Sequence, residues 1–341
     1  MFKFYFPDES TGRLPDDPSE FAQWFQGLAR TSTLLGPVAW TVQTYLHVRQ
    51  RGLNCELTTV WPDEGIVIAH RDHLPDVWAQ RPQRYVICCL ADRTLPHPCA
   101  NLHILQNPYQ FVRLGAYAYV PHWPQPGLQA RDPARGYRMR SLAFFGEVQN
   151  LAPELRGPEF AAWCQQQGLQ LTIPPREAWA DYRAVDASIA VRQFSNHWGA
   201  FDKPATKLFN AWLAGVVPIL GMESAYAAEG QHRRNCCVVP DLASLKALLI
   251  ELRDDATLLT ALLAAGTVAA QARSSAAVTD HWVHLLTQQV EPAARRRLRF
   301  SPLLAAPADG WSRLKAGLAW RGHLLHHQTP PSLLAGGLTA E

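Results

Sequence analysis

The sequence predicts an α/β protein built from two doubly wound domains in tandem, and three observations support this prediction. The 341 residues exceed the size of one ordinary domain, about 100–200 residues. Hydrophobic residues make up 48% of the chain and charged residues 18%, a composition that can bury a sizeable core and excludes a disordered or coiled-coil protein. Short apolar runs alternate with helical patterns over most of the length, as expected for largely parallel sheets covered by helices.

The first domain is expected over residues 1–125. Residues 2–6 are predicted to form its first strand. A helix is predicted over 37–51, because Pro37 suits a first helical turn, apolar residues recur at helical spacing and Gly52 ends the pattern. Four further short runs rich in β-forming residues are predicted as strands: 56–60, 65–69, 85–90 and 102–105. Proline-rich sequence follows, and residues 126–140 are predicted to form the linker.

The second domain is expected over residues 141–290. Its predicted strands are 141–145, 169–173, 186–191, 216–220 and 238–239. Helices are predicted over 158–167, closed by Gly168, over 206–214, closed by Gly215, and over most of 242–290. Residues 291–341 are expected to form a helical, basic tail, because residues 295–321 contain seven basic residues and one acidic residue.

Charge and cysteine content exclude several classes of protein. The net charge of +3 is too small to indicate a nucleic-acid-binding protein. The seven cysteines include no Cys-x-x-Cys pair, so buried reduced thiols in a cytoplasmic protein are expected. The apolar start of the chain is too short for a signal peptide, and the weakly polar stretch around 258–270 is shorter than the ~20 residues of a membrane span. A protein that is neither secreted nor membrane-spanning is expected.

Polar residues follow the strands of the second domain, at the end where open α/β sheets bind ligands. They are Gly146 with Glu147, Arg192, and residues 221–226. The loop before the helix at 206–214 adds Asp202, Lys203 and Thr206. Lys207 lies in the first turn of this helix, where a cation opposes the helix dipole unless an anion binds there. The stretch therefore indicates a diphosphate site, with a pair of solvated lysines as the alternative.

Residues 207–221, Lys-Leu-Phe-Asn-Ala-Trp-Leu-Ala-Gly-Val-Val-Pro-Ile-Leu-Gly, resemble the donor-site signature of glycosyltransferases of the GT-B architecture, of the family 1/4-like type. The match extends over 144–146, 179–186, 189–192 and 203–226. The resemblance implies two Rossmann-like domains. The second would bind a nucleotide-activated sugar and the first an acceptor, with transfer in the cleft between them.

The resemblance also implies roles for individual residues. Arg192, Lys203 and Lys207 would stabilise the departing diphosphate. The full donor-binding set is Gly146, Arg192, Asp202, Lys203, Thr206, Lys207, Asn210, Ser224, Ala225 and Tyr226. Where retaining members of the family carry two glutamates eight positions apart, this chain has Asp202 and Asn210. The stereochemical outcome stays open.

Polar residues also follow the strands of the first domain. Candidates for a general base are Asp92, Asp72 and His70, among which the sequence does not choose. Gln106, Asn107 and His122 are further candidates on the acceptor side. The acceptor would be a glycan, a lipid-linked compound or a small molecule.

The motifs of other enzyme classes are missing from the sequence. It has no Gly-x-Gly-x-x-Gly, no Walker motif and no Asp-x-Asp. We therefore expect a metal-independent enzyme without cofactor, in which lysine, arginine and helix N-termini neutralise the diphosphate. Residues 311–325 interleave apolar and basic side chains, which suggests peripheral contact with the inner face of a membrane.

Two alternatives to a glycosyltransferase stay open. The first is a nucleotide-sugar epimerase of the same architecture, which would need acid–base residues around one sugar carbon and no second substrate. The second is a non-catalytic sugar-nucleotide or glycan-binding protein, which the missing glutamate pair suggests.

Overall fold

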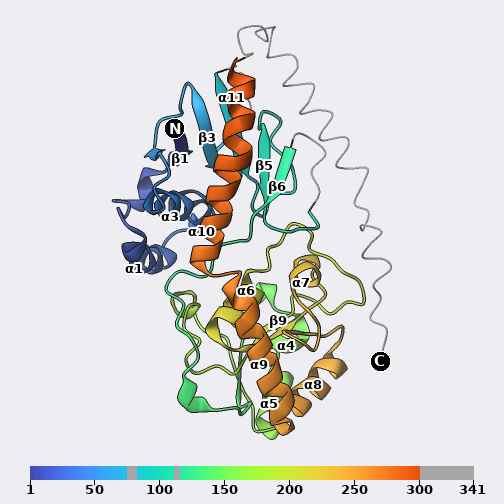
Figure 1. The fold of residues 1–341 in the computed structure, drawn as a ribbon. Helices are drawn as coiled ribbons and strands as arrows, with labels where there is room; N and C mark the ends of the chain where they lie inside the picture. The colour runs from blue at the N-terminus through green and yellow to red at the C-terminus, as the bar shows by residue number, and fades with distance from the viewer. Residues whose placement is uncertain (75–82, 111–115, 300–341) are drawn as a thin grey trace. The chain divides into compact units, whose positions relative to one another are not determined.

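The computed structural model describes residues 1–74, 83–110 and 116–299, and the chain divides into two compact units, each with one parallel sheet (Figure 1). Unit 1 comprises residues 1–122, 202–204 and those from 278 onward; unit 2 comprises 123–201 and 205–277. The predicted fold class of two α/β domains is thus confirmed. Residues 123–140, expected as the end of the first domain and the linker, belong to unit 2. Residues 278–290, expected in the second domain, and 291–299, expected in the tail, belong to unit 1.

The sheet of unit 1 has six parallel strands in the order β2-β1-β3-β4-β5-β6. The strands are β1 (Phe2–Tyr5), β2 (Cys55–Thr58), β3 (Gly65–His70), β4 (Arg84–Cys89), β5 (Leu102–Leu105) and β6 (Ala116–Tyr119). The three central strands, β3 to β5, are almost entirely buried, as expected of a parallel sheet with both faces covered. The edge strand β6 was not predicted from the sequence.

Helices of unit 1 come from both ends of the chain. They are α1 (Pro18–Ala29), α2 (Leu35–Pro37), η2 (Val38–Gln43), α3 (Thr44–Gln50), η7 (Leu285–Val290) and α11 (Glu291–Arg299), with the short turns η1 (Glu9–Thr11) and η3 (Arg71–His73). The helix predicted over 37–51 is present over 35–50, and its buried middle, η2, is a π-helix. Helix α11, the only described part of the predicted tail, packs along β4 (Figure 1). Residues 300–341 lie outside the described residues.

Unit 2 contains a five-stranded parallel sheet in the order β11-β10-β9-β7-β8. Its strands are β7 (Ser141–Ala143), β8 (Gln170–Thr172), β9 (Ala187–Ala190), β10 (Val217–Leu220) and β11 (Cys237–Val238). Each lies within or overlaps a strand predicted from the sequence, so the second series of alternating elements is confirmed.

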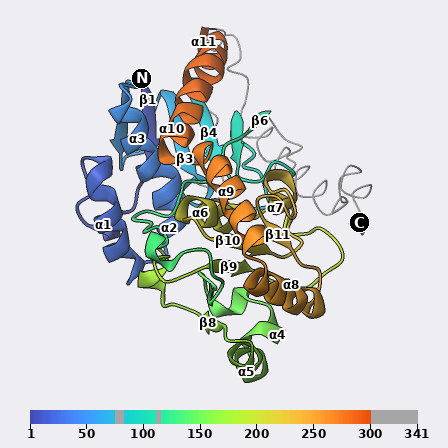
Figure 2. The same ribbon diagram turned by 60° about the horizontal axis from the view of Figure 1, so that its bottom comes forward.

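Helices of unit 2 surround this sheet. They are α4 (Pro153–Arg156), α5 (Pro158–Gln166), α6 (Thr206–Ala214), α7 (Ser224–Glu229), α8 (Leu242–Asp254), α9 (Ala256–Gln271) and the start of α10 (Ser275–His284), with the turns η4 (Pro133–Arg135), η5 (Val148–Asn150) and η6 (Arg176–Ala178). Helix α6 ends where predicted, because Gly215 adopts φ +68°, a left-handed conformation that glycine reaches without strain. Helices α6 and α9 pack side by side (Figure 2).

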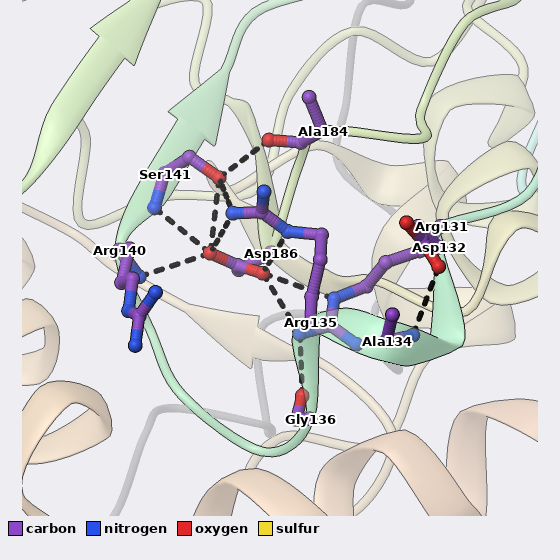
Figure 3. A network of polar contacts seen from close by, with 9 residues as sticks. All are labelled: Arg131, Asp132, Ala134, Arg135, Gly136, Arg140, Ser141, Ala184 and Asp186. Carbon is purple, nitrogen blue, oxygen red and sulfur yellow. Dashed lines mark hydrogen bonds and ion pairs between the residues drawn. The ribbon is translucent and has the colours of Figure 1, made fainter.

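The amino ends of β7 and β9 are joined by a network centred on Asp186, just before β9 (Figure 3). Its carboxylate, 1% exposed, accepts hydrogen bonds from the guanidinium groups of Arg131 and Arg135 at 2.8–3.0 Å. It also accepts the backbone N–H groups of Arg140 and Ser141 and the Ser141 hydroxyl at 2.9–3.0 Å. The network thereby ties residues 131–141 to the two central strands of unit 2.

Burial would raise the pKa of Asp186, but hydrogen bonds from Arg135, Arg140, Arg131 and Ser141 lower it from 3.8 to about 2. This shift corresponds to about 2.4 kcal/mol of stability at 1.36 kcal/mol per pKa unit. The contribution is fully present above the ordinary aspartate pKa and is lost as the pH falls from 3.8 through 2.

All seven cysteines are free thiols, and six of them are buried. Within residues 1–74, 83–110 and 116–299, no single helix is long and apolar enough to cross a membrane. Helix α8 and the helical stretch 256–298 meet these criteria only as a pair, bent by 99°.

We predict that Asp186→Asn lowers the free energy of unfolding by about 3 kcal/mol, because it leaves two arginines facing a neutral amide in a buried site. Urea unfolding at pH 7 measures this loss, and the difference from the unchanged protein should narrow between pH 4 and pH 2.

Asp181→Asn is the matched control, since Asp181 pairs with Arg183 at the surface and not in the core. Its unfolding midpoint should stay unchanged. Equal midpoints for the two variants would show that the buried network contributes no more stability than a surface ion pair.

Candidate functional site

The strand orders indicate one candidate ligand-binding edge in each unit. Both sheets follow the doubly wound order in which the second strand lies outside the first and the third lies on its other side. The order therefore reverses between β1 and β3 in unit 1 and between β7 and β9 in unit 2. Ligands of open α/β sheets bind beyond the carboxyl ends of the strands at such a switch point. His70 ends β3, and Gly146 and Arg192 follow β7 and β9.

Lys207 and Gly146 are neighbours at the carboxyl end of β7. A Cβ atom built on Gly146 would lie 3.3 Å from Lys207 Cε and 3.0 Å from Phe144 Cζ, so the absence of a side chain allows the lysine to approach the backbone. Lys207 Nζ lies 5.6 Å from the centre of the Phe144 ring. The Lys207 side chain thus lies beside the backbone of Gly146, at the switch point of unit 2.

Arg192 is oriented by two partners at the carboxyl end of β9. Its Nη1 donates a hydrogen bond to Asn150 Oδ1 at 2.5 Å, and its Nε lies 3.5 Å from Glu223 Oε1. Glu223 follows β10 and is 6% exposed, whereas the Arg192 side chain is 31% exposed. A guanidinium group that is oriented by two partners and is still partly exposed is suited to bind a phosphate.

Thr206 begins helix α6, and its buried Oγ1 has no hydrogen-bond partner among the described residues. Among the described residues no side-chain hydrogen bond caps this helix, and the N–H groups of a first helical turn favour an anion. Lys207, Arg192, Gly146 and Thr206 therefore offer positive charge and hydrogen-bond donors from three neighbouring elements of unit 2.

The other predicted donor residues of unit 2 are buried. Asn210 Oδ1 accepts the Gln125 N–H at 2.9 Å, and its side chain also hydrogen-bonds Tyr182. Ser224 donates its N–H to the Gly199 carbonyl at 2.7 Å. Ala225 and Tyr226 belong to the hydrophobic core, and burial raises the pKa of Tyr226 well above its usual value. All four side chains are buried within unit 2, and the charge of Arg192 acts on the Tyr226 hydroxyl.

Lys203 and Asp202 belong to unit 1, unlike Lys207. Lys203 Nζ lies 3.0 Å from Asp202 Oδ2 and 3.3 Å from Asp92 Oδ2. Gln106 Nε2 donates to Asp92 Oδ1 at 2.5 Å and to the Asp202 carbonyl at 2.9 Å. Asn107 Nδ2 donates to the Lys203 carbonyl at 3.1 Å. Lys203 and Gln106 thus contact Asp92, and Asp202 and Asn107 belong to the same network.

His70 and Asp72 form a second group in unit 1. Asp72 accepts two hydrogen bonds from Arg93, at 2.5 and 2.6 Å, and these lower its pKa. His70 Nδ1 lies 3.7 Å from Asp72 Oδ2 and accepts the Asp72 N–H at 3.1 Å. His70 is 3% exposed, and burial lowers its pKa to about 4. The ring of His122 lies 5.2 Å from that of Trp40.

Backbone strain is found beside Asp92. Ala91 has φ +49°, in the left-handed region that alanine rarely adopts. Ala200, two residues before Asp202, has φ +53°. Strained residues persist where the surrounding structure holds them, and they are common at functional sites.

The described residues contain no group of three or more His, Cys, Asp or Glu side chains that could hold a metal ion. The sequence analysis included Glu223 within the stretch 221–226 but gave it no role of its own. It missed Asn150, which had no comparable signal.

No protein-family model matches this chain, and no curated protein matches it. The chain is similar to several solved structures. Sucrose-phosphate synthase from Thermosynechococcus elongatus is 12% identical, with a TM-score of 0.44 over 80% of this chain and 78% of that one. The Anabaena protein Alr3699/HepE in complex with UDP is 11% identical, with a TM-score of 0.49 over 84% and 99%. AviGT4, a glycosyltransferase of avilamycin A biosynthesis, is 11% identical, with a TM-score of 0.42 over 87% and 97%.

Proposed function

We propose that this protein is a glycosyltransferase that transfers a sugar from a nucleoside-diphosphate donor to a hydroxyl acceptor. The observation that carries the proposal is the pair of oriented cations, Arg192 and Lys207, at the switch point of unit 2. Such a site suits a diphosphate, because two cations and first-turn N–H groups can share its negative charge.

The reaction forms a bond from the acceptor oxygen to the anomeric carbon of the sugar and breaks the bond from that carbon to the diphosphate oxygen. The proton of the acceptor hydroxyl passes to a candidate base, Asp92 or Asp72, or to the departing diphosphate. The diphosphate leaves with the bonding electrons, so negative charge develops on the oxygen that departs. Arg192 and Lys207 stabilise this charge most in the transition state, which lowers the barrier. We propose that these cations perform the neutralisation without a metal ion.

Unit 1 would bind the acceptor at the carboxyl ends of β3, β4 and β5. Asp92 with Gln106, and His70 with Asp72, provide hydrogen-bonding groups there. A glycan, a lipid-linked compound or a small polyol has the hydroxyl groups to use them. Turnover of the nucleotide sugar without any acceptor would instead indicate an epimerase, and binding without turnover a non-catalytic protein.

We predict that one nucleoside diphosphate among UDP, GDP, dTDP, CDP and ADP raises the melting temperature of the protein. At 100 times its dissociation constant the ligand should stabilise the fold by about 2.7 kcal/mol, which a thermal-shift assay detects. The shift should largely disappear in Lys207→Ala.

Lys246→Ala is the matched control for this experiment. Lys246 belongs to the same unit and also lies over an aromatic ring, that of Trp163 at 5.1 Å, but it is part of α8 and not of the switch point. It should keep the full shift. No shift with any of the five nucleotides, or equal losses in both lysine variants, would contradict the proposed diphosphate site.

We further predict that Arg192→Gln raises the dissociation constant of the stabilising nucleotide by about 10–100-fold, because a charged hydrogen bond contributes about 1.5–3 kcal/mol. Isothermal titration calorimetry measures the change. Arg192→Lys should recover only part of the affinity, since lysine keeps the charge but loses the planar fork. Full affinity in Arg192→Gln would place the phosphates elsewhere.

A further inference from the structure

His70 is an almost fully buried polar side chain at the switch point of unit 1. It ends β3 and precedes η3, and it is 3% exposed. As the cap of η3 it accepts the Asp72 N–H through Nδ1 at 3.1 Å. A nitrogen that accepts a hydrogen bond carries no proton, so the neutral ring must carry its proton on Nε2.

Nε2 points toward the start of the helical stretch 35–50. A Cβ atom built on Gly36 would lie 3.8 Å from Nε2, so this part of the ring faces backbone without a side chain. The described polar contacts of the His70 ring are those of Nδ1 with Asp72. The N–H group at Nε2 can therefore donate a hydrogen bond to an oxygen atom of a ligand.

We propose that His70 binds an oxygen atom of the substrate by donating a hydrogen bond from Nε2–H, and that it does not act as the general base. The proposal rests on the proposed glycosyl transfer and specifies the role of one residue in it. The oxygen belongs either to the nucleotide-activated sugar or to the acceptor. Either compound can offer a hydroxyl or phosphate oxygen that accepts a hydrogen bond from the ring.

The surroundings of His70 keep the ring in this neutral form. Burial lowers its pKa to about 4, and the nearby cation of Arg93 and the ring of His73 act in the same direction. The carboxylates of Asp72 and Asp92 oppose this effect, but Asp72 is engaged by Arg93 and Asp92 by Lys203. A base at Nε2 would need this nitrogen unprotonated, which would require a proton on Nδ1, where the Asp72 N–H already points.

The deciding experiment compares His70→Gln with His70→Leu. The glutamine amide can place an N–H near the position of Nε2, but it cannot accept a proton from a hydroxyl group. We expect His70→Gln to keep kcat/KM for transfer within about 5-fold of the unchanged protein and His70→Leu to lose about 10–100-fold, the range for a lost hydrogen bond that leaves a buried polar partner. Equal large losses in the two variants would overturn the proposal.

The tautomer of the ring separates this role from that of a general base at Nε2. The ring nitrogens of His70 in ¹⁵N-labelled protein, assigned by comparison with His70→Gln, should show the Nε2–H form at pH 7. The Nδ1–H form would overturn the proposal whether or not the protein is active.

Hydrolysis of the nucleotide sugar by water identifies the source of the oxygen. If the oxygen belongs to the sugar donor, His70→Leu slows hydrolysis and transfer equally; if it belongs to the acceptor, only transfer is slowed. Failure of the proposed function is distinguishable, because the unchanged protein would then bind no nucleoside diphosphate in the thermal-shift assay. In that case the ¹⁵N measurement still shows whether the proton of the neutral His70 ring is on Nε2 or on Nδ1.

Discussion

Parallel pairing of the strands is the constraint on which the rest of this molecule depends. Because all strands of each sheet run in one direction, all their carboxyl ends lie along one edge. Residues far apart in the sequence, such as Gly146, Arg192 and Glu223, are thereby brought to one edge of unit 2. The same constraint brings His70, Asp92 and Gln106 to one edge of unit 1.

The two edges of the sheet in unit 2 use charge in different ways. At the amino edge, Asp186 is saturated by two arginines, two N–H groups and a hydroxyl, so its charge serves stability alone. At the carboxyl edge, Arg192 has partners on one side only and Thr206 Oγ1 has none among the described residues. A network whose hydrogen-bonding groups are all paired rigidifies the structure around it. A group that still lacks a partner can form a hydrogen bond with a ligand.

Much of the fold could be predicted because its signals are local. Gly215 ends α6 through its own backbone conformation, and the apolar runs of β3, β4 and β9 are recognisable without their neighbours. Strand β6 and helix α1 were missed; β6 is largely exposed, so it lacks a continuous buried apolar pattern. For the site, sequence could indicate which residues follow a strand but not what they contact. Asn210 and Tyr226 occupy suitable positions in the motif, yet their side chains are buried in contacts within unit 2.

The partners of the candidate residues also distinguish the two ligand edges chemically. In unit 1, Asp72 is paired with Arg93 and Asp92 with Lys203, so the charges at this edge largely compensate one another. The neutral imidazole of His70 adds a hydrogen-bond donor but no charge. In unit 2, Lys207 lies over the Phe144 ring and beside Gly146, and the Arg192 side chain is 31% exposed. A charged diphosphate is therefore favoured at the edge of unit 2 and an uncharged hydroxyl compound at the edge of unit 1, which is the division that glycosyl transfer from a nucleotide sugar requires.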